Sequence, residues 1–161
     1  MGSCLMFNLF ENKPVVGKAS TLIQESDDKL FNFIGHELLT NYPRWSPEVR
    51  ELEKLSDSPL GLGTLCRQVR VDQGNRSEST FKVVIFEPNK RICFDGVSNP
   101  FRCDYSLEPK NEESTQITFT FELLSLELHM RPFEKLIRIA VQDGAERTVR
   151  NIKRLIEFNT I

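Results

Sequence analysis

The feature that most constrains the fold is a series of short alternating runs that fills the middle of the chain. After residue 48, apolar and polar residues alternate in six runs, and turn sequences such as DQGNR at 72–76 separate them. Alternation with a period of two is typical of a strand with one buried face. Hairpin-length connections between such strands favour antiparallel pairing. The sequence therefore predicts an antiparallel sheet with one solvated face. The runs occupy residues 49–55, 64–71, 77–86, 91–98, 101–108 and 115–128.

A strand and a helix are predicted before this series. Residues 14–25 alternate loosely, which indicates a first strand. Ser26 is a suitable N-cap for a helix whose apolar face carries Leu30, Phe33, Ile34 and Leu38. Asn41 and Pro43 are expected to stop this helix, because proline lacks the backbone N–H that a helix needs. The chain then turns at PRWSP, where Trp45, the only tryptophan, stands between two prolines.

A long helix is predicted at the C-terminal end, from Pro132 to Phe158. Its apolar residues recur at spacings of three and four, and charged residues occupy most of the other faces. Asp143-Gly144 could mark a turn, but the stripe continues on both sides, so one helix that tolerates the glycine is favoured. The stripe consists of Phe133, Leu136, Ile137, Ala140, Val141, Thr148, Ile152, Leu155 and Ile156.

Composition limits the classes of function. The 161 residues, 39% of them hydrophobic, suit one domain, with a lead-in at 1–12 and a folded core at 13–158. The net charge of −2 gives no electrostatic signature of nucleic-acid binding. Residues 1–10 lack the basic region and apolar core of a signal peptide, and Met6 stands where myristoylation favours Ser or Thr. No apolar run is long enough to span a membrane.

The cysteines indicate a reducing environment. Cys4, Cys66, Cys93 and Cys103 contain no C-x-x-C pair, which argues against a zinc or thioredoxin-like site. Cys93 and Cys103 stand almost symmetrically about one hairpin connection, which would make them cross-strand neighbours. We nevertheless expect free thiols and a cytoplasmic protein, because three of the four lie in apolar runs where cysteine acts as a small hydrophobe.

The order of the elements resembles a known superfamily. The segments that carry the likeness are SDDKLFNFI, NYPRWSPEV, GLGTLCRQVRV, FEPNKRICFDG and ERTVRNIKRLIE, which together span roughly residues 14–157. They are similar to the START / birch-pollen-allergen superfamily (SRPBCC), in particular its bacterial polyketide cyclase/dehydrase-like branch. The resemblance implies an α+β helix-grip fold. In this fold a curved seven-stranded antiparallel sheet wraps around a long C-terminal helix, and two short helices follow the first strand.

The helix-grip fold also implies a cavity between the sheet and the long helix. Ala140, Gly144 and Thr148 lie four apart on one helix face, and such small residues leave room either for facing phenylalanines or for a ligand. Trp45 is then either a plug in the core or part of the cavity wall. The expected cavity residues are Phe33, Trp45, Phe119, Phe121, His129, Ile137, Val141 and Gly144.

Two functions compete at this point, and a third class stays open. A concave apolar pocket with few polar groups suits the binding or transport of a small hydrophobic molecule that is lipid-, polyketide- or aromatic-like. The alternative is a polyketide cyclase, aromatase or dehydratase that uses the same cavity. The third is a quinone-chaperone-like or protein-interaction module. Neither His36 nor His129 stands in a nucleophile or metal motif, and no metal or other cofactor is expected. A monomer or a weak homodimer is expected.

Overall fold

The computed structural model describes residues 13–158, and a seven-stranded antiparallel sheet forms its centre. The strand order across the sheet is β1-β7-β6-β5-β4-β3-β2. The first strand forms one edge of the sheet and pairs with the last strand, β7. All other neighbouring strands are consecutive in the sequence. This confirms the predicted antiparallel sheet and the helix-grip architecture. The strands are β1 (Val15–Ile23), β2 (Val49–Lys54), β3 (Leu65–Asp72), β4 (Asn75–Glu87), β5 (Arg91–Gly96), β6 (Phe101–Asn111) and β7 (Ser114–Leu123).

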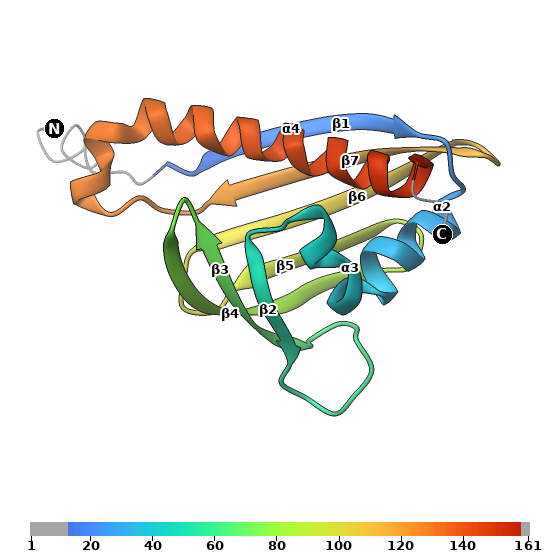
Figure 1. Cartoon of the computed structure of the whole chain (residues 1–161), viewed down its shortest axis with the longest axis horizontal. Coiled ribbons are helices and arrows are strands. Elements are labelled where there is room, and N and C mark those ends of the chain that lie inside the picture. Colours follow the sequence, from blue (N-terminus) through green and yellow to red (C-terminus); the bar gives the residue numbers. More distant parts are fainter. Residues whose placement is uncertain (1–12, 159–161) are drawn as a thin grey trace, which may run out of the picture.

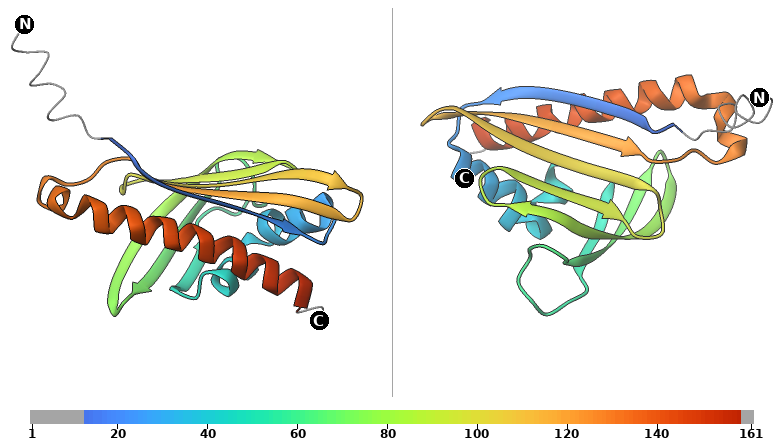
Figure 2. Two further views of the ribbon diagram at one scale, coloured as in Figure 1. Left: turned by 90° about the horizontal axis from the view of Figure 1, so that it is seen from above. Right: turned by 180° about the vertical axis from the view of Figure 1, so that it is seen from behind.

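The helices lie on the concave side of the sheet. α4 (Glu134–Phe158) follows the short 3₁₀ segment η2 (Leu128–Phe133) and runs along β1 and β7, as Figure 1 shows. The views in Figure 2 show the sheet curving away from α4 toward β3 and β4. The short helical elements gather near the C-terminal end of α4. They are α2 (Asp27–Phe31), the π-helical turn η1 (Asn32–His36) and α3 (Leu38–Trp45).

A glycine in β1 brings α4 to this edge of the sheet. A Cβ at Gly17 would stand 2.5 Å from the backbone oxygen of Val141, so only a residue without a side chain allows the helix to approach so closely. The side-chain amide of Gln142 makes two hydrogen bonds to β1. Its NH₂ group donates to the backbone carbonyl of Lys18, and its oxygen accepts from the backbone N–H of Lys18. The helix is thereby fixed against β1, while the middle of the sheet curves away from it.

α4 is buried along only part of its length. Its buried residues are Ala145, Val149 and Ile152, all in the C-terminal part. The sequence predicted that the whole apolar stripe would pack on the core. This is wrong for the first residues of the stripe, because Phe133 and Leu136 are exposed. The reason lies in the curvature of the sheet, which leaves no packed layer beneath the first turns of the helix. The single uninterrupted helix through Gly144 is confirmed.

The first helix does not stop where the sequence predicted. α3 continues through Asn41 and Pro43 to Trp45, and the break lies earlier, at the π-helical turn. There the N–H of Glu37 donates to the carbonyl of Asn32, and the buried Asn41 side chain donates to the carbonyl of Phe33 at 3.0 Å. Asn41 thus satisfies a carbonyl near the break, and its polar side chain stabilises the bend rather than ending the helix.

The register separates two cysteines that stood symmetrically in the sequence. Cys93 pairs with Asp104 and Cys103 pairs with Phe94, so the two side chains belong to opposite faces of the sheet. They are therefore not facing cross-strand neighbours. Cys66, Cys93 and Cys103 are buried free thiols in the structure. Cys4 and the N-terminal features, including Met6, lie outside the described residues. Among residues 13–158, no helix is long and apolar enough to cross a membrane.

Candidate functional site

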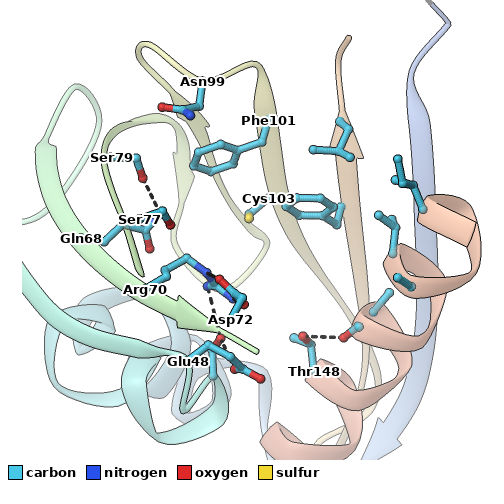
Figure 3. Close-up of a pocket in the computed structure, with 18 of the residues that line it drawn as sticks. Glu48, Gln68, Arg70, Asp72, Ser77, Ser79, Asn99, Phe101, Cys103 and Thr148 are labelled. Carbon is cyan, nitrogen blue, oxygen red and sulfur yellow. Dashed lines mark hydrogen bonds and ion pairs between the residues drawn. The ribbon is translucent and has the colours of Figure 1, made fainter. Parts of the chain in front are cut away.

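A cavity of about 620 Å³ lies between α4 and the concave face of the sheet. Its size falls within the range of small-molecule sites. The strands β3, β4, β6 and β7 line one side and α4 lines the other (Figure 3). The end of α3 with Ser46 and Glu48, and the segments at 99–100 and 125–130, complete the lining. The cavity thus occupies the space that remains where the sheet curves away from the helix.

One wall of the cavity is apolar. β6 and β7 present Phe101, Cys103, Tyr105, Phe119 and Phe121, which alternate along their strands and so share one face. Tyr105 and Phe119 are directly opposite each other across the two strands, with ring centroids 4.6 Å apart. The facing side comes from α4. It is formed by Ile137, Ala140, Val141, Gly144, Ala145 and Thr148.

Gly144 marks the open centre of the helical side. Apart from the backbone of its own helix, a Cβ at this position would have no atom within 4 Å. The Thr148 hydroxyl donates a hydrogen bond to the Gly144 carbonyl one turn earlier, at 2.9 Å, so this hydroxyl has its partner within the helix. The gap is therefore not filled by a facing phenylalanine, which was one of the two outcomes that the small-residue row allowed.

Trp45 closes the inner end of the cavity. It is 1% exposed, lines the cavity, and its Nε1 donates to the Tyr105 hydroxyl at 3.3 Å. Its backbone carbonyl accepts from the Asn151 side chain of α4 at 3.0 Å. The rigid PRWSP corner therefore ties α3 to both the sheet and the long helix. Trp45 is at once a core residue and a wall of the cavity.

The part of the sheet wall formed by β3 and β4 is polar, and it is built around Arg70 of β3. Its guanidinium donates to both carboxylate oxygens of Asp72, at 3.2 and 3.1 Å, and to the hydroxyls of Tyr42 and Ser46, at 3.3 and 3.4 Å. Burial would lower the pKa of Arg70, but the neighbouring Tyr42 and Asp72 raise it, so the guanidinium stays charged. Arg70 is thus a fixed cation whose carboxylate partner is already in place.

A second ion pair links the same region to α4. Glu48 stands 3.6 Å from the guanidinium of Arg147, and it also accepts from the Ser46 hydroxyl at 3.2 Å. The chain of contacts therefore runs from β3 through α3 to the long helix. It closes the cavity beside Trp45, on the side away from β1.

Gln68, two residues before Arg70, faces the same cavity. It is 2% exposed, and its Nε2 donates to the Ser79 hydroxyl of the neighbouring strand at 3.2 Å. Its Oε1 is buried and has no hydrogen-bond partner within the described residues. Figure 3 shows the side chain beside Ser77 and Ser79 at the polar side.

The buried groups that could carry protons in the cavity are held neutral. Burial raises the pKa of the Tyr105 phenol well above its usual value, and burial likewise raises the pKa of Tyr42 and of the Cys103 thiol. A buried neutral phenol is a hydrogen-bond donor and a poor base at neutral pH. No group of three or more His, Cys, Asp or Glu side chains within residues 13–158 is arranged to hold a metal ion.

The structure places six of the expected cavity residues on the wall and two elsewhere. Phe33 packs against Trp45, with ring centroids 5.9 Å apart, and the Arg44 guanidinium stands over the Phe33 ring at 5.6 Å from its centroid. His129 is 71% exposed in η2, beside Glu127, because this short turn directs it to solvent. The residues on the wall are Trp45, Phe119, Phe121, Ile137, Val141 and Gly144.

Sequence reasoning missed the polar side altogether. In TLCRQVRV, Val69 and Val71 look like the inward residues, which would turn Gln68 and Arg70 to solvent. The register shows the reverse, since Cys66 pairs with the buried Phe81 and side chains two apart share its face. Because Cys66 and Val69 are both buried although they lie on opposite faces, the sequence of β3 carries no signal for the cavity face, and only the pairing with Phe81 decides it.

The family of the chain follows from comparison with known proteins. A family model described as "Polyketide cyclase / dehydrase and lipid transport" matches residues 18–157, which is most of the chain. The chain belongs to this family. The membership confirms the resemblance to SRPBCC proteins of the polyketide cyclase/dehydrase-like branch. A comparison with curated proteins gives no match.

Solved structures similar to this member of the polyketide cyclase / dehydrase and lipid transport family support the fold. The Zhui aromatase/cyclase from a Streptomyces species has a TM-score of 0.73 at 11% identity, covering 91% of this chain and 98% of its own. TTHA0849 from Thermus thermophilus has a TM-score of 0.68 at 17% identity, covering 91% of this chain and 99% of its own. Cgl2372 from Corynebacterium glutamicum, described as Polyketide_cyc-like, has a TM-score of 0.65 at 19% identity, covering 91% of this chain and 94% of its own. At these identities the likeness concerns the fold alone.

Proposed function

We propose that the protein binds and carries a small hydrophobic molecule in the cavity between the sheet and α4. The observation that carries this proposal is the open space at Gly144, in the middle of a cavity of about 620 Å³. Side chains normally fill the space between a helix and the sheet that it covers, so a cavity of this size between α4 and the sheet needs a reason. A lipid-, polyketide- or aromatic-like molecule would pack against the rings of Phe119 and Phe121.

The titratable groups favour a carrier over an enzyme. General acid–base catalysis works best with a group whose pKa lies near the working pH. In this cavity burial moves the pKa of Tyr105 and Tyr42 upward, away from neutrality, and the exposed His129 is not on the wall. Asp72 and Glu48 are each held by an arginine. These features supply shape and hydrogen bonds rather than a proton shuttle.

A cyclase or aromatase activity is the second candidate. Its specific support is Tyr105, whose neutral phenol accepts from Trp45 and keeps a proton that it could donate to a ligand carbonyl. The Zhui protein, described as an aromatase/cyclase, shares the fold. In that case a bound polyketide-like chain would leave the cavity chemically changed.

Binding can be tested through Trp45, the only indole in the chain. Titration with the neutral dye N-phenyl-1-naphthylamine should raise the dye emission and change that of Trp45, because the indole lines the cavity. Native mass spectrometry of protein from its source organism should show a copurified small molecule. A protein that carries no molecule and leaves both emissions unchanged would contradict the proposal. An altered mass of the bound molecule after incubation would favour the enzyme.

A further inference from the structure

The amide of Gln68 carries information about what the cavity binds. Its Oε1 is buried without a hydrogen-bond partner among residues 13–158, although the side chain is only 2% exposed. Buried polar atoms are nearly always paired, and leaving one unpaired destabilises the protein. Because Gln68 lines the cavity, the missing partner has to come from inside it.

We propose that the ligand is an uncharged apolar molecule with a hydroxyl group, and that Gln68 binds this hydroxyl. The proposal rests on the proposed function, since it names the class of molecule that the cavity would take. It concerns one end of the ligand, at β3 and β4, while the apolar body lies against β6, β7 and α4.

A hydroxyl suits Gln68 in either orientation of the amide. With Nε2 toward Ser79, as in the structure, the free Oε1 needs a donor. If the amide turns over, Ser79 donates to the oxygen and the free NH₂ needs an acceptor. A hydroxyl both donates and accepts, so it satisfies either arrangement, whereas a hydrocarbon satisfies neither. A water molecule can hold this place before the ligand binds, and a hydroxyl replaces its hydrogen bond when it is displaced.

The ion pairs of the cavity argue against a charged ligand. A carboxylate would seek the guanidinium of Arg70, but Asp72 already holds it through two hydrogen bonds. The Arg147 guanidinium stands beside Glu48. A cationic ligand meets the same obstacle at Asp72 and Glu48, which each have an arginine partner, and at Glu78, which pairs with Arg67. The remaining carboxylate of the lining, Glu127, is 80% exposed and stays hydrated beside His129. Either charge would lose its hydration without gaining a free counter-ion, which costs far more than burying a neutral group.

Three naphthalenes that differ at one position test this inference. We would measure how 2-naphthol, 2-methylnaphthalene and 2-naphthoate displace N-phenyl-1-naphthylamine from the protein at neutral pH. The hydroxyl compound should bind about tenfold more tightly than the methyl compound, because only the hydroxyl pairs with the amide. The carboxylate should bind most weakly. The ring is common to all three, so the differences report the substituent.

Variants of Gln68 assign the preference to this side chain. Gln68→Leu, and Gln68→Met as a second variant of similar length, should bind the hydroxyl and methyl compounds with affinities within about twofold of each other. Ser79→Ala is the matched control, since it removes the neighbouring hydroxyl and leaves the amide, and it should keep the preference. The readout is the ratio of two affinities in each protein, so a change in overall stability does not imitate the effect.

The outcomes separate this inference from the function on which it rests. If the dye binds but the wild-type protein does not prefer 2-naphthol, or if both Gln68 variants keep the preference, the inference is overturned and the apolar binding site stands. Tighter binding of 2-naphthoate than of 2-naphthol also overturns it. If neither the dye nor any naphthalene binds, the proposed function fails, and the inference fails with it.

Discussion

Replacing Gly144 by leucine should block the cavity and stabilise the fold at the same time. The position lies within α4, where a Cβ would meet no atom within 4 Å. A side chain placed there therefore enters open space rather than a packed layer. The isobutyl group would occupy the centre of the cavity, facing the ring-lined wall of β6 and β7.

Two favourable terms set the expected magnitude. Glycine is about 1 kcal/mol less favourable than a good helix former in a helix interior. Full burial of a leucine side chain contributes about 1.5–3 kcal/mol, of which we count roughly a third because the cavity is open to solvent. The free energy of unfolding should therefore rise by about 1–2 kcal/mol. Gly144→Ala, the matched control, should gain about 1 kcal/mol and leave most of the cavity empty.

Urea denaturation and dye binding measure the two effects separately. We expect the leucine variant to unfold at higher urea and to bind N-phenyl-1-naphthylamine at least about tenfold more weakly, while the alanine variant keeps its affinity. If Gly144 faced a full core, leucine would instead destabilise the protein by about 1–3 kcal/mol. A leucine variant that unfolds at lower urea, or one that binds the dye as the wild type does, would refute the reasoning from open space.

Three further changes test the fold around the cavity. Gly17→Ala should lower the free energy of unfolding by about 1–3 kcal/mol in urea, because its Cβ would stand 2.5 Å from the backbone oxygen of Val141. Asn41→Ala should cost about 1–3 kcal/mol in the same assay, since it leaves the Phe33 carbonyl without its side-chain donor. Burial raises the pKa of the Cys66 thiol from 9.0 to about 11, so the folded state binds more protons in this interval. The contribution of the Cys66 thiol to the free energy of unfolding should be fully present below about pH 9. It should be lost as the pH rises to about 11.

Each of these tests has its own control. Gly61→Ala should be nearly neutral, because the nearest atom to its Cβ is 4.0 Å away, and an equal loss there would refute the close approach at Gly17. Asn41→Asp keeps an acceptor but removes the donor, so a stable aspartate variant would contradict the assigned hydrogen bond. Cys66→Val should reduce the loss of stability between about pH 9 and 11, while the buried Cys93 and Cys103 keep their own shares. An unchanged pH profile would show that this thiol does not contribute.

The elements of the fold were predictable because each follows from a local pattern. Alternation identified the strands, and helical spacing identified α4 in spite of Gly144. The same two periodicities grouped Phe119 with Phe121, and Ile137 with Val141, on faces that line the cavity. Side chains on one face of a regular element move together, so a correct element brings its residues to one side.

The polar side of the cavity was not predictable in this way. Both faces of β3 contain apolar residues, so alternation alone does not say which face is concave. Phe33 lies within the π-helical turn Asn32–His36, where the α-helical spacing used to predict its face does not apply. A π-helical turn has no strong sequence pattern, and the tertiary contacts of Asn41 decide it.

The uneven burial of α4 has a kinetic consequence. The C-terminal part of the helix is anchored by Ala145, Val149 and Ile152, whereas the first turns cover the cavity and contribute no buried residue. Local unfolding is easiest where few apolar contacts are lost, so amide protons before Val141 should exchange with solvent faster than those after Ala145. The first turns of α4 should therefore open locally more often than the anchored C-terminal part, without global unfolding of the protein.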